Sequence, residues 1–135
     1  IGDAILAVFG APQYRDDDAD RAVKCALAMQ AAMADINALN EAEGFPAINT
    51  GIAINTGDVI AGNIGSERRS KYGFVGHPMN VTSRIEDVTA GGEILISEST
   101  LQSLKGNYRL GRSEQINVKG IDETILVHQV TGEKT

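Results

Sequence analysis

Cysteine, basic charge and long apolar runs are all scarce in this sequence, and each shortage argues against a class of protein. The single cysteine, Cys25, rules out an internal disulfide framework and fits a reducing compartment. There are 12 Lys and Arg against 18 Asp and Glu, and the net charge of -6 argues against broad nucleic-acid binding. No apolar run approaches the roughly 20 residues that span a bilayer. We therefore expect a cytoplasmic chain that binds no nucleic acid, within a parent protein that could still be membrane-anchored.

The length and composition are those of one ordinary globular domain. The chain has 135 residues, of which 42% are hydrophobic and 22% charged. This is enough to bury a core, and the balance is not that of a disordered chain. The sequence begins at Ile1 rather than at a methionine. We expect residues 1–135 to form a single domain that belongs to a longer protein.

Apolar spacing and capping residues predict three helices. The first is rich in Ala, Met, Leu and Lys and follows an acidic run in which Asp17 or Asp18 is the expected cap. The second begins at Pro78, a favoured first helical residue, and the third is short and ends at Gly106. The expected ranges are 19–43, 78–89 and 99–106. The side chains of the second helix that we assign to the core are Met79, Val81 and Ile85.

Short apolar runs and turn residues predict the strands. The stretch from Ile48 to Gly65 alternates in hydrophobicity and is interrupted at Asn55 to Asp58, which predicts two strands joined by a tight turn. The other expected strands cover 4–10, 71–76, 93–97, 108–119 and 124–130. Strands and helices interleave, and some strands are joined as hairpins. This order favours an α/β (α+β) fold with a mixed or largely antiparallel sheet over a doubly wound parallel one.

Asn80 and Arg84 are the first candidate site residues. They stand four residues apart in the second expected helix, so their side chains lie on one face and can converge on one ligand. An amide beside a planar guanidinium suits a phosphorylated sugar. The alternative is an ordinary solvated face on which Arg84 pairs with Glu86 or Asp87, and spacing alone favours that alternative.

Other polar residues have a functional and a structural interpretation. Asp3, at the entry to an apolar strand, is either a turn residue or a metal ligand. Lys119, between two strands, is either a solvated turn residue or a phosphate ligand. His77 and His128 have no cysteine or carboxylate at metal-binding spacing, and we interpret them as structural.

The acidic run at the start of the first helix contains Asp16, Asp17, Asp18 and Asp20. We interpret it as a solvated cluster that complements the helix dipole. No G-x-x-x-x-G-K-[ST] loop, G-x-S-x-G elbow or C-x-x-C pair is present.

Taken in order, five segments carry a resemblance. They are IGDAILAVFGAP, GIAINTGDVIAGNIGS, KYGFVGHPMNVTSRIE, GGEILIS and NVKG. Each is weak alone, but the ordered set covers essentially the whole chain and closely resembles the catalytic domain of the class III nucleotide cyclases. The resemblance implies a ferredoxin-like sheet flanked by helices.

The resemblance also implies roles for four residues. Asp3 matches the second of two metal-binding aspartates. Asn80 matches the residue that orients the ribose, and Arg84 the one that stabilises the transition state at the α-phosphate. Lys119 matches the lysine that holds the terminal phosphates. The implied cofactors are two Mg²⁺ or Mn²⁺ ions.

The implied reaction is attack of the ribose 3′-hydroxyl on the α-phosphate of a nucleoside triphosphate, which releases pyrophosphate and closes a 3′,5′-cyclic nucleotide. In the family the site lies between two subunits, so the resemblance implies a homodimer with two equivalent sites. Asp3 would come from one subunit, and Asn80, Arg84 and Lys119 from the other. An upstream sensor or regulatory domain is the expected fusion partner.

The sequence departs from the family pattern in two ways. The first metal aspartate belongs to an N-terminal strand and helix that the family places before Ile1, so we expect an N-terminally incomplete domain. The family discriminates the base at one position before Ile1 and at one that aligns with Gly73, where adenylate cyclases usually have Asp or Thr. Gly73 has no side chain for either purine.

Three hypotheses follow from these observations. The first is an active purine nucleotide cyclase, with ATP favoured and GTP as the alternative. The second is a non-catalytic cyclase-homology domain that dimerises or regulates a partner. The third, and the weakest, is an unrelated α/β binding module.

Overall fold

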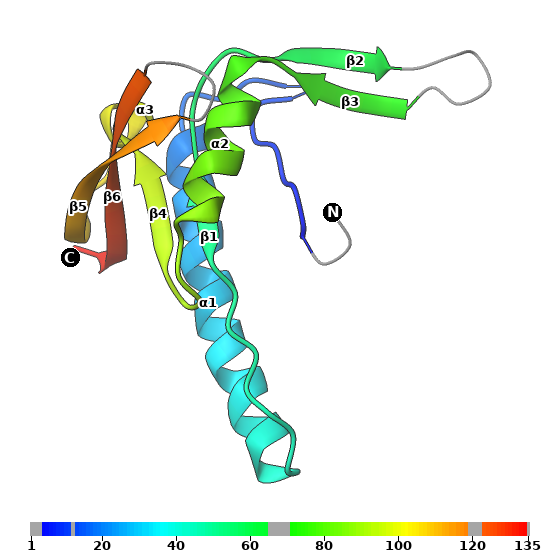
Figure 1. Cartoon of the computed structure of the whole chain (residues 1–135), viewed down its shortest axis with the longest axis vertical. Coiled ribbons are helices and arrows are strands. Elements are labelled where there is room, and N and C mark those ends of the chain that lie inside the picture. Colours follow the sequence, from blue (N-terminus) through cyan, green and yellow to red (C-terminus); the bar gives the residue numbers. More distant parts are fainter. Residues whose placement is uncertain (1–3, 12, 65–70, 119–122, 135) are drawn as a thin grey trace.

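The structure is a computed structural model, and it describes residues 4–11, 13–64, 71–118 and 123–134 (Figure 1). In chain order these residues form α1 (Asp18–Ala42), β1 (Ile52–Ile54), β2 (Ile60–Ile64), β3 (Lys71–Val75), α2 (His77–Asp87), β4 (Ile94–Ser97), α3 (Glu98–Ser103), β5 (Tyr108–Val118) and β6 (Glu123–Glu133).

Four of these strands form one mixed sheet in the order β1-β4-β6-β5. β1 and β4 run parallel, whereas β4 with β6 and β5 with β6 are antiparallel. β2 and β3 form a separate antiparallel ribbon that extends away from this sheet (Figure 1). A mixed, mainly antiparallel sheet flanked by helices confirms the expected fold class.

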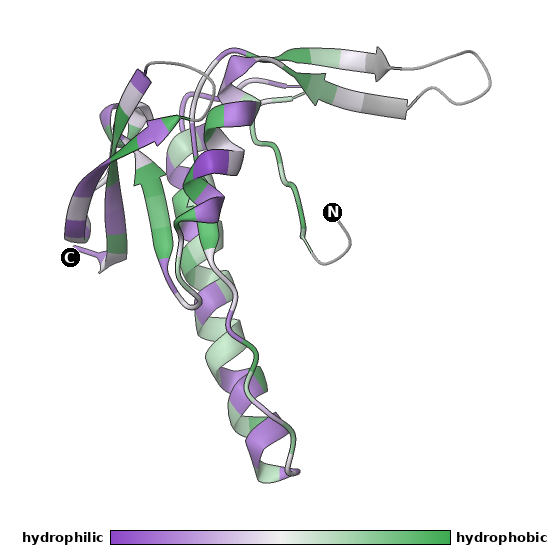
Figure 2. Cartoon of the chain, viewed as in Figure 1, coloured by the Kyte–Doolittle hydropathy of each residue, from purple (hydrophilic) through white to green (hydrophobic). Residues whose placement is uncertain are grey.

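The helices cover opposite faces of the four-stranded sheet. Side chains alternate between the faces along a strand. β4 is mainly hydrophobic (Figure 2) and is buried on both faces. Ile94 and Ile96 of β4 pack in one cluster with α1 and with apolar residues of α3, whereas Leu95 packs in a second cluster with α2. The sheet is therefore the middle layer, with α1 and α3 on one side and α2 on the other.

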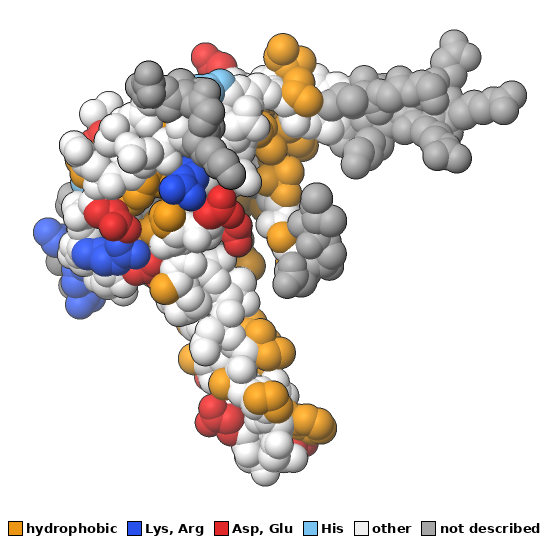
Figure 3. Space-filling view, in the orientation of Figure 1, with side chains coloured by type: hydrophobic (Ala, Val, Ile, Leu, Met, Phe, Trp, Pro, Cys, Tyr) orange, Lys and Arg blue, Asp and Glu red, His pale blue; other side chains and the backbone are white. Residues whose placement is uncertain are grey.

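α1 is long but only partly packed. Its buried residues, Asp20, Val23 and Ala26, all lie in its first three turns. Farther along, Ile36 is 45% and Leu39 69% exposed. The far half of α1 extends beyond the sheet, and hydrophobic side chains are visible along it (Figures 1 and 3). Asn37 ties the returning chain to this half, because its amide donates to Ile48 O at 2.7 Å and accepts from Ile48 N–H at 2.8 Å.

The expected strand at residues 4–10 is wrong. Its described residues are not paired with any described strand, and Ile5 and Leu6 are 87% and 60% exposed. An apolar run becomes a strand only where another strand offers its backbone hydrogen bonds. No described strand lies beside this segment in that way.

The expected hairpin at Ile48 to Gly65 is also wrong. Its two strands exist, but β1 pairs with β4 and β2 pairs with β3. The residues between them form no tight turn, and the loop packs against the start of α2. An alternating pattern identifies a strand, but it does not say which other strand lies beside it.

The remaining elements agree with the sequence to within a few residues. α1 and α2 confirm the first and second expected helices, and Asp17 is the N-cap residue of α1, although its side chain makes no capping hydrogen bond. α3 ends at Ser103 with Leu104 as its cap, so the expected end at Gly106 is wrong. Val81 and Ile85 are buried in the core as expected, whereas Met79 is only half-buried and belongs to neither core cluster. Among the described residues, no helix is long and apolar enough to cross a membrane.

Asp20 departs from the expected solvated acidic cluster. It is only 6% exposed, and its carboxylate accepts hydrogen bonds from Lys105 N–H, Gly106 N–H and the Tyr108 hydroxyl at 2.9, 3.0 and 2.7 Å. Burial by itself would raise the pKa of Asp20, but these hydrogen bonds outweigh it and hold the pKa below its ordinary value. Asp20 therefore fastens the start of α1 to the chain that enters β5.

Candidate functional site

α2 carries two of the candidate residues, and its start is set by Gly76 and Pro78. Gly76 is the N-cap residue with a φ of 145°, a conformation that favours glycine. Pro78 occupies the first turn, where its missing N–H has no helical partner to lose. Val81 and Ile85 then bury one face of the helix against the sheet. This packing leaves the opposite face free for polar side chains.

Asn80 and Arg84 lie on α2 as predicted. The Asn80 side chain is exposed and has no hydrogen-bond partner among the described residues. Arg84 Nε donates to the backbone oxygen of Asn117 in β5 at 2.8 Å, and Arg84 lies 4.0 Å from the carboxylate of Asp87. The Asp87 contact is the ordinary helix pair expected as the alternative, and a pair at that distance on the surface is weak. The bond to β5 is the firmer contact of Arg84.

Gly73 lies in the β2–β3 ribbon, away from the four-stranded sheet. It is directly opposite Gly62. Two glycines in register leave this point of the ribbon without side chains on either strand. The position that the resemblance assigns to base recognition therefore offers backbone groups only.

Two other candidates, Asp3 and Lys119, lie outside the described residues. In sequence, Lys119 directly follows Val118, the last residue of β5, and comes two residues after Asn117. Among the described residues, no group of three or more His, Cys, Asp or Glu side chains could hold a metal ion.

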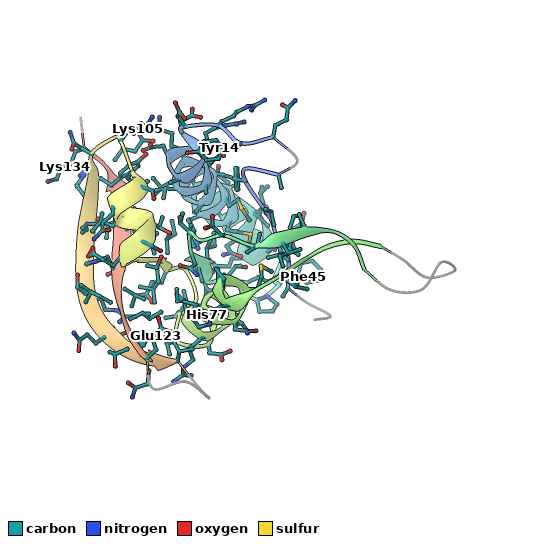
Figure 4. All side chains as sticks on the ribbon, turned by 90° about the horizontal axis from the view of Figure 1, so that it is seen from above. Tyr14, Phe45, His77, Lys105, Glu123 and Lys134 are labelled. Carbon is teal, nitrogen blue, oxygen red and sulfur yellow. The ribbon has the colours of Figure 1, made fainter. Side chains whose placement is uncertain are left out.

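Both histidines have carboxylate partners that spacing in the sequence did not reveal. His77 Nε2 lies 2.9 Å from Glu123 Oε2 (Figure 4), and His128 Nε2 lies 3.0 Å from Glu98 Oε1. Each pair joins a helix to β6. The partners are 46 and 30 residues apart in sequence, so only the fold brings them together.

Sequence reasoning also missed the polar contacts around the first turn of α2. Asn55 Nδ2 donates to Pro78 O at 3.0 Å, and Ser99 Oγ donates to Asn55 Oδ1 at 3.2 Å. Because residues 55–58 interrupt an alternating pattern, the sequence places Asn55 in a hairpin turn. A polar residue directly after a short apolar strand was the available signal for a different role.

A cavity of about 420 Å³ opens beside this turn. His77, Pro78 and Val81 form its α2 wall, and residues 97–99 and 123–126 complete most of the rest. A smaller cavity of about 250 Å³ lies at the start of α1. Asn80 and Arg84 line neither cavity, so the exposed face of α2 is separate from both.

Comparison with known proteins shows the family of this chain. Over residues 1–132 the chain matches the family model of the adenylate and guanylate cyclase catalytic domain. The chain therefore belongs to this family of nucleotide cyclase domains, and the resemblance seen in the sequence is confirmed.

Individual relatives include cyclases of both types. An adenylate cyclase of Anabaena cylindrica is 35% identical over 96% of this chain, which spans 27% of that relative. The solved structure of the guanylyl cyclase Cya2 is 42% identical, with a TM-score of 0.92 over 99% of this chain and 68% of that chain. The adenylyl cyclase CyaB of P. aeruginosa is 32% identical, with a TM-score of 0.83 over 93% of this chain and 66% of that chain. The present chain thus spans about a quarter of the length of the curated Anabaena relative.

Proposed function

We propose that residues 1–135 belong to the catalytic domain of a purine nucleotide cyclase. It would convert a nucleoside triphosphate to a 3′,5′-cyclic nucleotide and pyrophosphate, by attack of the ribose 3′-hydroxyl on the α-phosphate. The observation that carries the proposal is the hydrogen bond from Arg84 to Asn117 in β5, two residues before Lys119. It joins the helix that bears Asn80 and Arg84 to the strand that leads to the proposed phosphate-binding lysine.

In this proposal Asn80 and Arg84 act on different parts of the nucleotide. The exposed Asn80 amide both donates and accepts, which suits the hydroxyls and ring oxygen of a ribose. The Arg84 guanidinium has five N–H donors, and only Nε is used by the Asn117 carbonyl. Nη1 makes only the weak surface contact with Asp87 at 4.0 Å, so the terminal nitrogens could meet the negative charge that develops at the α-phosphate in the transition state. Lys119 would hold the terminal phosphates as a point charge.

Asp3 is the proposed metal ligand. A carboxylate is the donor class that Mg²⁺ and Mn²⁺ prefer, so Asp3 fits as one ligand of a divalent ion. Within the described part of the chain, no group of three or more His, Cys, Asp or Glu side chains could hold a metal ion. When bound, such ions neutralise phosphate charge and activate an oxygen nucleophile.

A homodimer is the proposed assembly, with Asp3 and the group formed by Asn80, Arg84 and Lys119 supplied by different subunits. Support comes from family membership and from the exposure of Asn80. Fusion to an upstream sensor domain remains a proposal as well, since the chain spans about a quarter of its Anabaena relative.

ATP is the first candidate substrate and GTP the second. The Anabaena relative and CyaB are named as adenylate cyclases. GTP is favoured by the 42% identity to the guanylyl cyclase Cya2. Gly73 opposite Gly62 favours neither, because no side chain is present there to read the purine edge.

Incubating the full-length protein with ATP or GTP in the presence of Mn²⁺, followed by mass spectrometric identification of the product, tests the proposal. We expect cyclic AMP and pyrophosphate as products. The rate per subunit should fall when the protein is diluted below the dissociation constant of its dimer. Cyclic GMP alone would replace the first candidate by the second. If neither substrate gives a cyclic nucleotide, the proposed enzymatic activity is overturned and the non-catalytic cyclase-homology domain is favoured.

A further inference from the structure

The first turn of α2 is held from outside the helix. Its N-cap residue is Gly76, which offers no side chain, and no side-chain capping hydrogen bond is made. Gly76 and Pro78 favour a helix start at this point of the chain, but no N-cap side chain satisfies the first N–H groups of the helix. The position of Asn80, two residues after Pro78, therefore depends on what other segments do to this turn.

Two segments make these contacts: β6 pairs its Glu123 with His77, and the loop after β1 contacts Pro78. Asn55 Nδ2 donates to Pro78 O at 3.0 Å, and that oxygen also accepts from the Thr82 hydroxyl at 2.7 Å. A side chain on Gly57 would place its Cβ 2.5 Å from Pro78 Cγ, nearer than real atoms approach. The loop thus holds Pro78 by a hydrogen bond at Asn55 and by close packing at Gly57.

Asn55 is itself oriented from the far side by α3. Ser99 Oγ lies 3.2 Å from Asn55 Oδ1 and 2.9 Å from both Thr56 O and Ser97 Oγ, so the bond to Asn55 is the longest of these three contacts. Thr56 Oγ1 in turn lies 2.8 Å from the hydroxyl of Thr100, which is fully buried. The amide of Asn55 is thereby turned so that its NH₂ group faces Pro78.

We propose that Asn55 is a positioning residue of the active site, which fixes the first turn of α2 and through it the side chain of Asn80, with Ser99 orienting the Asn55 amide. The proposal rests on the cyclase function proposed above. Asn55 touches neither substrate nor reacting atoms, and it acts by keeping Asn80 in the one orientation that meets the ribose. Errors of about 1 Å in such a group can cost roughly 100-fold in rate.

Two substitutions separate this role from simple support. Asn55→Asp keeps the size of the side chain and the acceptor for Ser99, but it replaces the donor to Pro78 O by an oxygen. Asn55→Ala removes both bonds. We expect both variants to lower kcat by roughly 10- to 100-fold with KM changed by less than about threefold. Near wild-type activity in Asn55→Asp would overturn the proposal, because the donor would then be dispensable.

A double-substitution cycle tests whether Asn55 acts through Asn80. In an Asn80→Ala background, Asn55→Ala should lower kcat by less than about twofold, because its effect has already been lost. Full additivity of the two losses would overturn the proposal. Ser99→Ala should show a smaller loss than Asn55→Ala, and Ser99→Thr, which keeps a hydroxyl, should restore activity.

Asn37→Ala is the matched control. Asn37 also uses its amide to fix a loop, through two bonds to Ile48, but that loop lies at the far half of α1. We expect a comparable change in melting temperature and no change in kcat. A loss of kcat in Asn37→Ala equal to that in Asn55→Ala would reduce the role of Asn55 to general stability.

Amide hydrogen exchange in the full-length protein distinguishes failure of this inference from failure of the cyclase assignment. The reporters are the N–H groups of Met79, bonded to Gly76 O at 3.1 Å, and of Thr82. In Asn55→Asp both should exchange about fivefold faster, the change expected for one lost hydrogen bond, while exchange in β4 stays unchanged. Unchanged exchange at Met79 and Thr82 would overturn the positioning role even if the protein makes no cyclic nucleotide.

Discussion

The helices on the two faces of the four-stranded sheet differ in how much of their length is packed against it. α2 has 11 residues and buries Val81 and Ile85 against the sheet, while α1 has 25 residues and buries side chains only near its start. The short helix is held by the core, by the loop after β1 and by Arg84 on β5. The candidate site therefore lies on the helix that other elements hold along more of its length. A site that requires accurate geometry needs such support.

The largest expected effect is on catalysis at the α2 face. Arg84→Ala should lower kcat by roughly 100- to 1000-fold, because a donor that meets charge only in the transition state acts on kcat rather than on KM. Steady-state kinetics of cyclic nucleotide formation measure this. Glu86→Ala, an exposed position on the same helix, is the control and should be active. A pure change in KM for Arg84→Ala would place Arg84 in substrate binding instead.

The next largest effect concerns how much each helix contributes to the free energy of unfolding. Ile85 is fully buried and Ile36 is 45% exposed. Ile85→Ala should lower the free energy of unfolding by about 3 to 4 kcal/mol, since it opens a cavity. Ile36→Ala should lower it by less than about 1 kcal/mol. Urea denaturation of both variants measures these losses. Equal losses of unfolding free energy would mean that the far half of α1 is packed in the folded protein.

Asp20, the polar anchor of α1, should give an effect of intermediate size. Asp20→Asn should lower the free energy of unfolding by about 2 kcal/mol at pH 7, as expected for hydrogen bonds to a charged group. The pKa of Asp20 is below its ordinary value of 3.8 in the folded chain. Its contribution is therefore complete above about pH 4 and is lost as the pH falls through the folded-state pKa. Denaturation at several pH values should show the two proteins converging in acid, and a gap that stays constant would exclude the carboxylate as its source.

The smallest effect is expected for an ion pair between β5 and the residue that precedes β4. Arg112 contacts Glu93 at 2.7 and 3.0 Å and also pairs with Glu114. Arg112 lowers the pKa of Glu93, burial acts in the other direction, and the Ala90 N–H lowers it further. Because Arg112 is 41% exposed, Arg112→Ala should cost less than about 1 kcal/mol.

An NMR titration of Glu93 provides the more sensitive readout for that variant. The pKa of Glu93 should rise when Arg112 is replaced by Ala. Arg109→Ala, which removes bonds to the backbone oxygen of Glu133 instead, should leave the Glu93 pKa unchanged. A Glu93 pKa that is the same in all three proteins would show that the Arg112 pair is not formed in solution.

Local patterns were sufficient for α1, α2 and the strands from β3 onward. Periodicity, Pro78 and the glycines that interrupt the runs act within a few residues, so they can be read without knowing the fold. Asn80 and Arg84 could be placed on one helix for the same reason. The segment at residues 4–10 shows the limit, because an apolar run predicts burial but does not provide the neighbouring strand.

Local sequence was sufficient to predict the helix that carries Asn80 and Arg84, and the ordered motifs were sufficient to assign the chain to the cyclase family. The fold was needed to show that β1 lies beside β4, that Asp20 is buried against a tyrosine 88 residues away, and that Asn55 donates a hydrogen bond to Pro78, 23 residues later. The difference follows from how far apart in sequence the interacting residues are. Helix periodicity and capping depend on neighbours in sequence, whereas strand pairing and side-chain hydrogen bonds between loops depend on how the whole chain closes on its core.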